Sequence, residues 1–186
     1  MTRKTVGFAM CGSFCTFSRA IPQIDALIDA GYDVLPIMSY NASTTDTRFG
    51  KAQNFIDEIE EKTKRKIIRT INDAEPIGPK AMTDIMLIAP CTGNTISKLS
   101  YGITDTPVTM AAKSHLRQEK PLIIAIATND ALGASAQSIG RMLNTKHIFF
   151  VPFGQDAPIK KPKSLVANFE SVSYTHLRAH ETSLHL

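Results

Sequence analysis

Three short runs of almost uninterrupted apolar residues constrain the fold of this 186-residue chain most strongly. They are Thr5–Met10 (TVGFAM), residues 85–89 (IMLIA) and residues 122–127 (LIIAIA). A strand with one face in solvent alternates apolar and polar residues, whereas these runs have no polar face. We therefore expect each run to be a strand of a parallel sheet that helices cover on both faces.

Amphipathic stretches separate the apolar runs, as an alternating α/β fold requires. Ile21, Ile24, Leu27 and Ile28 recur at helical spacing before Gly31, a residue that suits the end of a helix. Further helices are expected over residues 49–64, 92–101, 106–118 and 135–143. Further strands are expected over residues 33–38, where Pro36 suggests an irregularity, over 66–71, and over 147–151 as the last strand. A polar loop is expected at residues 39–47. The pattern predicts a three-layer, doubly wound α/β domain with a parallel sheet.

The composition excludes several classes of protein. Apolar residues make up 43% and charged residues 20% of the chain, which excludes a largely disordered or fibrous protein. No apolar run approaches the roughly 18 residues of a membrane span, so we expect no membrane crossing. A net charge of +4 without basic clusters interleaved with aromatics does not indicate nucleic-acid binding. Three cysteines without metal-ligand spacing predict neither a disulfide framework nor a metal site. The short apolar stretch near the N-terminus does not suit a signal peptide, so we expect a cytoplasmic protein.

The C-terminal part of the chain departs from the α/β pattern. Residues 160–163 (KKPK) are interpreted as a basic linker, and His176, His180 and His185 follow it. Residues 174–182 (YTHLRAHET) resemble a string found at the ends of unrelated sequences, where it looks like translated sequencing adaptor. We therefore expect one domain over residues 1–170 and a non-native tail over residues 171–186, with a histidine-rich metal-binding tail as the alternative.

Four loops that follow predicted strands carry the candidate chemistry. In a doubly wound sheet, ligands bind at the carboxyl ends of the strands. The corresponding loops, residues 11–16, 39–44, 90–95 and 128–130, are rich in hydroxyl, amide and small side chains. This composition suits a phosphate-bearing ligand, although serine and threonine before a helix also serve as plain N-caps. Neither GxxxxGK[ST] nor GxGxxG is present, which argues against a P-loop or an ordinary NAD site.

One of these loops opens a longer motif. Residues 89–105 (APCTGNTISKLSYGITD) resemble the P-x-[ST]-x-N-T-x-x-K-x-x-x-G-x-x-D signature of the flavoprotein family, which includes flavin-containing cysteine decarboxylases. The resemblance extends from Thr5 to about Phe169. It implies a flavodoxin-like or Rossmann-like fold, a homo-oligomer and an FMN cofactor. By this resemblance, Asn129 lies near the isoalloxazine or the substrate, and the FMN contacts fall on Gly12, Ser13, Ser39, Thr92, Asn94 and Thr95.

Two departures from the family separate this chain from the decarboxylases. Those enzymes use a histidine from an early helix, whereas the first histidine here is His115. Family members often have Pro-Ala-Met-Asn where this chain has residues 126–129 (IATN). The decarboxylation chemistry is therefore not carried over, and the substrate side of the pocket is expected to differ.

A closer resemblance to one family member is carried by residues 102–113, 127–133 and 149–156. It implies one half of a two-subunit oxidoreductase whose dehydrogenase-like partner holds NAD(P). The implied substrate is a small dianion, for which Lys98, Lys113 and Arg117 are the candidate binding residues, with Arg19 a further cation. Lys113 and Arg117 are one helical turn apart, which also suits an exposed basic face.

Two alternatives stay open. The chain could be a non-catalytic, flavin-free subunit that shapes its partner's site, because Asp130 is the only obvious general base in the four loops. It could also be an FMN-dependent decarboxylase, against the missing early histidine. Cys11 and Cys91 follow neighbouring strands and are either a redox pair or small buried residues. No catalytic residue is assigned.

Overall fold

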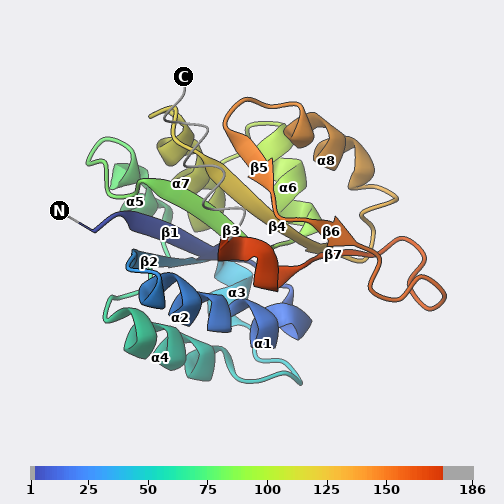
Figure 1. The fold of residues 1–186 in the computed structure, drawn as a ribbon, viewed down its shortest axis with the longest axis horizontal. Coiled ribbons are helices and arrows are strands. Elements are labelled where there is room, and N and C mark those ends of the chain that lie inside the picture. The colour runs from blue at the N-terminus through green and yellow to red at the C-terminus, as the bar shows by residue number, and fades with distance from the viewer. Residues whose placement is uncertain (1–2, 174–186) are drawn as a thin grey trace.

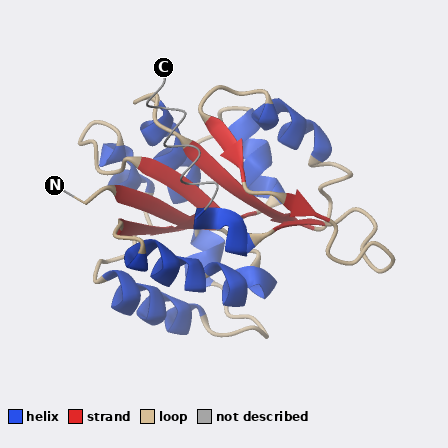
Figure 2. Ribbon diagram, viewed as in Figure 1, coloured by secondary structure: helices blue, strands red, loops and turns tan. Residues whose placement is uncertain are grey.

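A seven-stranded sheet forms the centre of the molecule, with helices on both of its faces (Figures 1 and 2). The computed structural model describes residues 3–173. The strands are β1 (Thr5–Met10), β2 (Asp33–Met38), β3 (Ile85–Cys91), β4 (Leu122–Thr128), β5 (Ile148–Phe150), β6 (Phe153–Gly154) and β7 (Leu165–Ala167). No described helix is both long enough and apolar enough to span a membrane.

Two helical layers cover the sheet. One contains α1 (Phe17–Ala20), α2 (Pro22–Asp29), α3 (Tyr40–Thr44) and α4 (Ala52–Thr63), together with the 3-10 turns η1 (Phe14–Thr16) and η3 (Phe169–Ser171). The other contains α5 (Ile71–Ala74), η2 (Glu75–Ile77), α6 (Gly93–Ser100), α7 (Pro107–Leu116) and α8 (Ala136–Leu143). Along β4, Ile123 and Ala125 pack into the first layer while Ile124 and Ile126 pack into the second. Both faces of the strand are buried, which is why its sequence has no polar alternation.

The order of the parallel strands creates a switch point between β1 and β3. The sheet runs β2-β1-β3-β4, and β5 also pairs with β4 in parallel. The chain moves outward from β1 to β2 and then crosses to the other side of β1 to form β3. This is the flavodoxin-like order, and it confirms the predicted three-layer, doubly wound architecture.

The sheet is mixed rather than wholly parallel. β7 pairs antiparallel with β4 at Ala127 and Thr128, and β6 pairs antiparallel with β7. β5 reaches only as far as Ile124 along β4, so the carboxyl end of β4 needs another partner for its backbone groups. The strand predicted at residues 147–151 is present as β5, but it is not the last strand, because β6 and β7 follow it.

Three smaller predictions also change. The expected loop at residues 39–47 contains α3, because the Ser39 side chain caps the N-terminus of that helix. The expected strand at residues 66–71 is reduced to a single bridge between Ile37 and Ile68. Pro36 interrupts no pairing, since β2 is at the edge of the sheet and keeps its register with β1 throughout.

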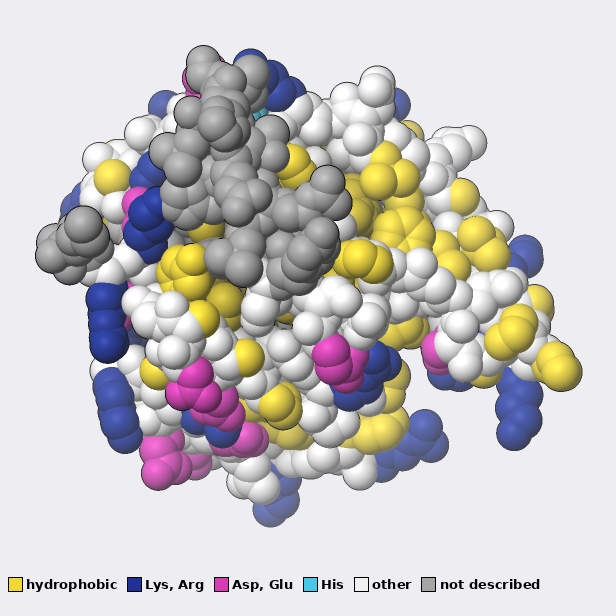
Figure 3. Space-filling model, viewed as in Figure 1, with side chains coloured by type: hydrophobic (Ala, Val, Ile, Leu, Met, Phe, Trp, Pro, Cys, Tyr) yellow, Lys and Arg dark blue, Asp and Glu magenta, His cyan; other side chains and the backbone are white. Residues whose placement is uncertain are grey.

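The basic run at residues 160–163 lies in the loop between β6 and β7 and does not link two domains. Figure 1 shows this loop projecting from the body, and Figure 3 shows hydrophobic and basic side chains at its end. Beyond it, Phe169 and Val172 are fully buried in the core. A cut after residue 170 would remove Val172 from that core. The tail with His176, His180 and His185 lies outside the described residues.

Candidate functional site

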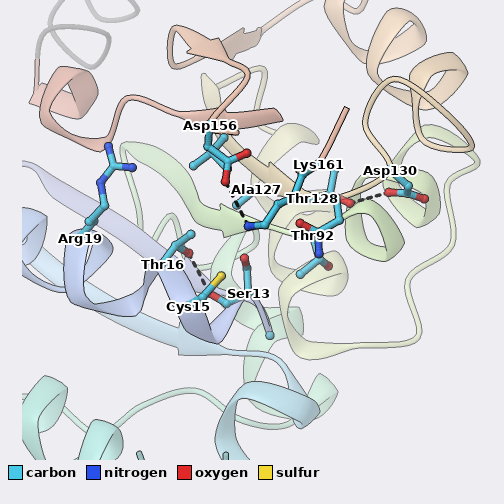
Figure 4. Close-up of a pocket in the computed structure, with 13 residues that line it drawn as sticks. Ser13, Cys15, Thr16, Arg19, Thr92, Ala127, Thr128, Asp130, Asp156 and Lys161 are labelled. Carbon is cyan, nitrogen blue, oxygen red and sulfur yellow. Dashed lines mark hydrogen bonds and ion pairs between the residues drawn. The ribbon is translucent and has the colours of Figure 1, made fainter. Parts of the chain in front are cut away.

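Two adjoining cavities lie at the carboxyl ends of β1, β3 and β4, and both reach Gly12 and Thr92. The α6 cavity, of about 420 Å³, is lined also by Ser39, Asn41, Asn94, Thr95, Lys98 and Asp105. The β4 cavity, of about 450 Å³, is lined also by Ser13, Arg19, Asn129, Asp130, Asp156 and Lys161 (Figure 4). The four loops that the sequence singled out therefore meet at one edge of the sheet, as the switch-point rule requires.

The start of α6 offers hydrogen-bond donors to the α6 cavity. Thr92 is the N-cap, and its Oγ1 accepts from the backbone N–H of Thr95 at 3.3 Å. The first N–H groups of a helix, here those of Gly93 and Asn94, have no acceptor within the helix. Among the described residues no hydrogen bond uses them, and the exposed Asn94 side chain is also unpaired. These donors and the helix dipole suit an anion.

The hydroxyls of Thr92 and Thr95 are engaged within the protein. Thr92 Oγ1 donates to Thr95 Oγ1 at 3.1 Å, and Thr95 Oγ1 donates to Cys11 Sγ at 3.2 Å. This chain of hydrogen bonds joins the start of α6 to the end of β1. Of the three predicted contacts on this loop, Asn94 is the one whose side chain is free to meet a ligand.

The three cysteines occupy different surroundings. Cys11 and Cys91 are buried, and burial raises the pKa of the Cys11 thiol to about 11. Burial, and then the proximity of Cys11, raise the pKa of Cys91 well above its usual value. Both side chains are therefore protonated thiols at neutral pH, which favours their interpretation as small buried residues. Cys15 is exposed and lines the β4 cavity.

The α6 cavity contains one ion pair. Lys98 Nζ lies 2.8 Å from both carboxylate oxygens of Asp105, in the loop between α6 and α7. Ser39 also lines this cavity; its N–H donates to Met10 O at 2.9 Å, and its Oγ accepts from the N–H of Ala42 at 3.2 Å. The charge of Lys98 is thus largely balanced before any ligand enters.

Asp130 lies against the start of α6. The hydrogen bond from Thr128 is the main cause that lowers the pKa of Asp130, and Ser135 Oγ also donates to its Oδ1, at 2.9 Å. A Cβ atom on Gly93 would stand 2.5 Å from Ser135 Oγ and 2.8 Å from Asp130 Oδ1. Only glycine therefore lets α6 begin so close to this cluster. A carboxylate with a lowered pKa is a weak general base at neutral pH.

Sequence reasoning missed the contribution of the loop between β6 and β7. Asp156 and Lys161 come from this loop, form an ion pair at 3.2 Å and line the β4 cavity (Figure 4). A hydrogen bond from Ser164 is the main cause that lowers the pKa of Asp156. The basic run at residues 160–163 was the available signal.

The other predicted residues line two different cavities, the β4 cavity and a third cavity outside it. Asn129 is exposed in the β4 cavity, where its Oδ1 lies 3.5 Å from Ser164 Oγ. Arg19 lines the same cavity and pairs with Glu170 at 3.2 Å. Lys113 and Arg117 line neither cavity. They lie together at a third cavity between helices.

Comparison with known proteins identifies the protein family of this chain. The flavoprotein family pattern matches residues 1–163, and the chain belongs to the flavoprotein family. Within that family, it is 45% identical over 172 residues to the B subunit of dipicolinate synthase from Bacillus subtilis (strain 168), covering 92% of this chain and 86% of that protein.

Solved structures agree with this relationship. The crystal structure of the B subunit of dipicolinate synthase from Bacillus halodurans matches with a TM-score of 0.86 and 45% identity, over 95% of this chain and 90% of that one. The FMN-dependent cysteine decarboxylase SpaF matches with a TM-score of 0.69 and 19% identity, over 95% and 97% of the two chains. The similarity to SpaF, at 19% identity, shows a shared fold.

The residues of the α6 cavity and the β4 cavity, which together we call the crevice, fit a phosphate-bearing flavin. The unpaired donors at the start of α6 suit the phosphate. Each cavity falls within the roughly 300–1,000 Å³ of small-ligand sites. The β4 cavity adds an apolar wall from Ala127 and Val166.

Proposed function

We propose that this chain acts as the B subunit of dipicolinate synthase. Together with the dehydrogenase-like A subunit of that enzyme, it would oxidise dihydrodipicolinate, or its hydrated precursor from the lysine pathway, to dipicolinate. The observation that carries the proposal is the 45% identity to a dipicolinate synthase chain over 92% of this one. The proposal places the reaction in the cytoplasm of the mother cell of a sporulating bacterium and includes contacts between copies of this chain.

The cofactor proposed for this chain is FMN, with NAD(P) on the dehydrogenase-like subunit. The residues that would hold it are those of the crevice: Gly12, Ser13, Ser39, Thr92, Asn94 and Thr95, with Asn129 near the ring or the substrate. When bound, FMN supplies an acceptor for two electrons. The chain's own part is to bind the phosphate at the start of α6, to fix the orientation of the ring, and to exclude water.

The proposed oxidation removes one hydride and one proton from the dihydropyridine ring as it becomes aromatic. Among the described residues, no histidine lines either cavity, and the pKa of Asp130 is lowered. Asp130 is therefore a weak acceptor for that proton at neutral pH. This favours a second candidate function, in which the chain is a flavin-free partner that shapes the active site of the dehydrogenase-like subunit. The same lack of a histidine disfavours the FMN-dependent decarboxylase.

The test begins with the visible absorption spectrum of the purified full chain, before and after addition of FMN. It continues with turnover after mixing with the dehydrogenase-like subunit. Bound flavin together with turnover only in the mixture supports the first candidate. No flavin binding, with activation of the dehydrogenase-like subunit, selects the flavin-free partner. Neither flavin binding nor an effect on that second protein refutes both candidates.

A matched pair of variants locates the flavin. Asn94→Ala removes an exposed, unpaired side chain from the α6 cavity, whereas Asn54→Ala removes an exposed one from α4, outside the crevice. A hydrogen bond to a charged group contributes about 1.5–3 kcal/mol, so Asn94→Ala should weaken FMN binding by about tenfold or more. Asn54→Ala should bind FMN as the wild type does. Equal affinities for all three proteins would refute the assignment of Asn94.

A further inference from the structure

A third cavity, of about 420 Å³, lies between α6, α7 and α8. It shares no lining residue with the α6 cavity or the β4 cavity. α6 packs against both α7 and α8, so the walls of this space come from three helices of one layer. We call it the cationic cavity, because Lys113, Arg117 and Arg141 line it.

The floor of the cationic cavity is apolar. Leu99 and Leu116 are half-buried, Met142 and Ile148 are buried, and Ile103 is 45% exposed at the opening. Two of the hydroxyls that line it are already used, since Ser100 Oγ donates to Ser97 O and Thr145 Oγ1 donates to Arg141 O. A ligand would therefore meet an apolar surface below and depend on the rim for polar recognition.

Three cations stand around this floor. Lys113 and Arg117 come from one side of α7 and its C-terminal end, and Arg141 comes from α8. None of the described residues that line the cavity is acidic, and no ion pair of Lys113, Arg117 or Arg141 is formed within the described part of the chain. This differs from Lys98 and Lys161 in the crevice, which both have carboxylate partners.

Arg141 is held in place without being neutralised. Its Nη1 donates to Ser100 O at 3.1 Å, and its guanidinium lies 4.6 Å from the ring centroid of Tyr101. These contacts leave other N–H groups of the guanidinium available and fix its orientation. A fixed, planar guanidinium is suited to bind a carboxylate.

From this geometry we propose that the cationic cavity binds a small cyclic dicarboxylate, at a site separate from the crevice. The ring would lie on the apolar floor, and the two carboxylates would meet Lys113, Arg117 and Arg141. A dianion among three unpaired cations leaves a small residual charge, whereas a neutral ring would leave all three unbalanced. The choice of ligand rests on the proposed function, because dipicolinate is a planar ring with two carboxylates. The cavity and its three cations do not depend on that function.

The experiment titrates dipicolinate into the full chain by isothermal calorimetry, without the dehydrogenase-like subunit and without flavin. The Lys113→Gln/Arg117→Gln variant should weaken binding by about tenfold or more, since it removes two charge-assisted contacts. The control, Lys51→Gln/Lys80→Gln, removes the same charge from exposed positions away from the cavity and should leave the affinity within about twofold. Pyridine, which lacks the carboxylates, should not compete.

Several results would overturn the proposal. One is no binding at concentrations on the order of 1 mM. Another is equal weakening by the two double variants, which would indicate a general charge effect. Loss of binding only in Lys98→Gln would place the dicarboxylate in the crevice. If Lys113→Gln/Arg117→Gln weakened association with the dehydrogenase-like subunit while dipicolinate did not bind, the surface would be a protein contact.

The two proposals fail separately. Flavin retention and turnover test the proposed function, whereas this calorimetric experiment requires neither. A chain that binds dipicolinate at the cationic cavity but never supports turnover would refute only the first. A chain that supports turnover but binds no dicarboxylate at this cavity would refute only the second.

Discussion

His115 should make the stability of this protein fall as the pH decreases below neutrality. The side chain is 1% exposed, between Thr83 and Pro121. Its Nε2 lies 3.0 Å from Pro121 O, which can only accept, so Nε2 carries the proton. Nδ1 then accepts from Thr83 Oγ1 at 2.8 Å. The neutral imidazole is therefore fully paired, and a second proton would face a hydroxyl that now donates to Nδ1.

Burial is the main cause that lowers the pKa of His115 from 6.5 to about 4. The hydrogen bond to Pro121 and the charge of Asp84 oppose this change, and Lys120 adds to it. Between these two pKa values His115 binds more protons in the unfolded chain than in the folded one. The contribution of the neutral His115 to the free energy of unfolding is therefore fully present above pH 6.5 and is lost as the pH falls towards 4. The expected loss relative to neutral pH is about 2 kcal/mol at about pH 5 and about 3 kcal/mol at about pH 4.

The assay is urea unfolding followed by circular dichroism at a series of pH values between about 7.5 and 4. Other groups also titrate in this range, so the readout is the difference between wild type and His115→Gln, which does not titrate. Thr83→Val is the control, because it removes the partner of Nδ1 but keeps the buried imidazole and hence the pH dependence. Parallel curves for wild type and His115→Gln would refute the reasoning.

Three further predictions concern packing, capping and thiol reactivity. A Cβ atom on Gly78 would collide with a backbone carbonyl of α7, so Gly78→Ala should lower the free energy of unfolding by about 3 kcal/mol or prevent folding. Gly140 lies within α8 with open space around it, so Gly140→Ala should raise the free energy of unfolding by about 0.5–1 kcal/mol. The same urea assay measures both changes. Thr92→Ala removes the N-cap of α6 and should cost about 1 kcal/mol and also weaken FMN binding, as checked by urea unfolding and flavin titration; unchanged stability would contradict the capping role. A thiol reagent should modify Cys15 rapidly in the native protein and the two other cysteines only after unfolding, and rapid reaction of all three would contradict their assigned burial.

Local patterns predicted most of the elements and the edge of the sheet where the two candidate cavities lie. The apolar runs in β1, β3 and β4 predicted buried parallel strands, because covering both faces leaves no position for a polar residue. The plain N-cap interpretation of the threonine in the loop at residues 90–95 is confirmed for Thr92 at α6, since a cap depends on residues only two or three positions apart. Helical spacing, which also acts over a few residues, predicted that Lys113 and Arg117 face the same way, and both line one cavity.

Contacts between distant segments of the chain decided the rest. Only the tertiary structure pairs β7 with the end of β4, and this brings Asp156 and Lys161 to the β4 cavity. It also directs the Thr95 hydroxyl to Cys11, 84 residues earlier, and separates Lys113 and Arg117 from the crevice. The sequence by itself determined the class of fold and the loops that meet at the switch point, because periodicity and capping act over a few residues. The side chains of those loops that remain free for a ligand were decided by hydrogen-bond and ion-pair partners far away in the chain. Only the tertiary packing brings these partners together.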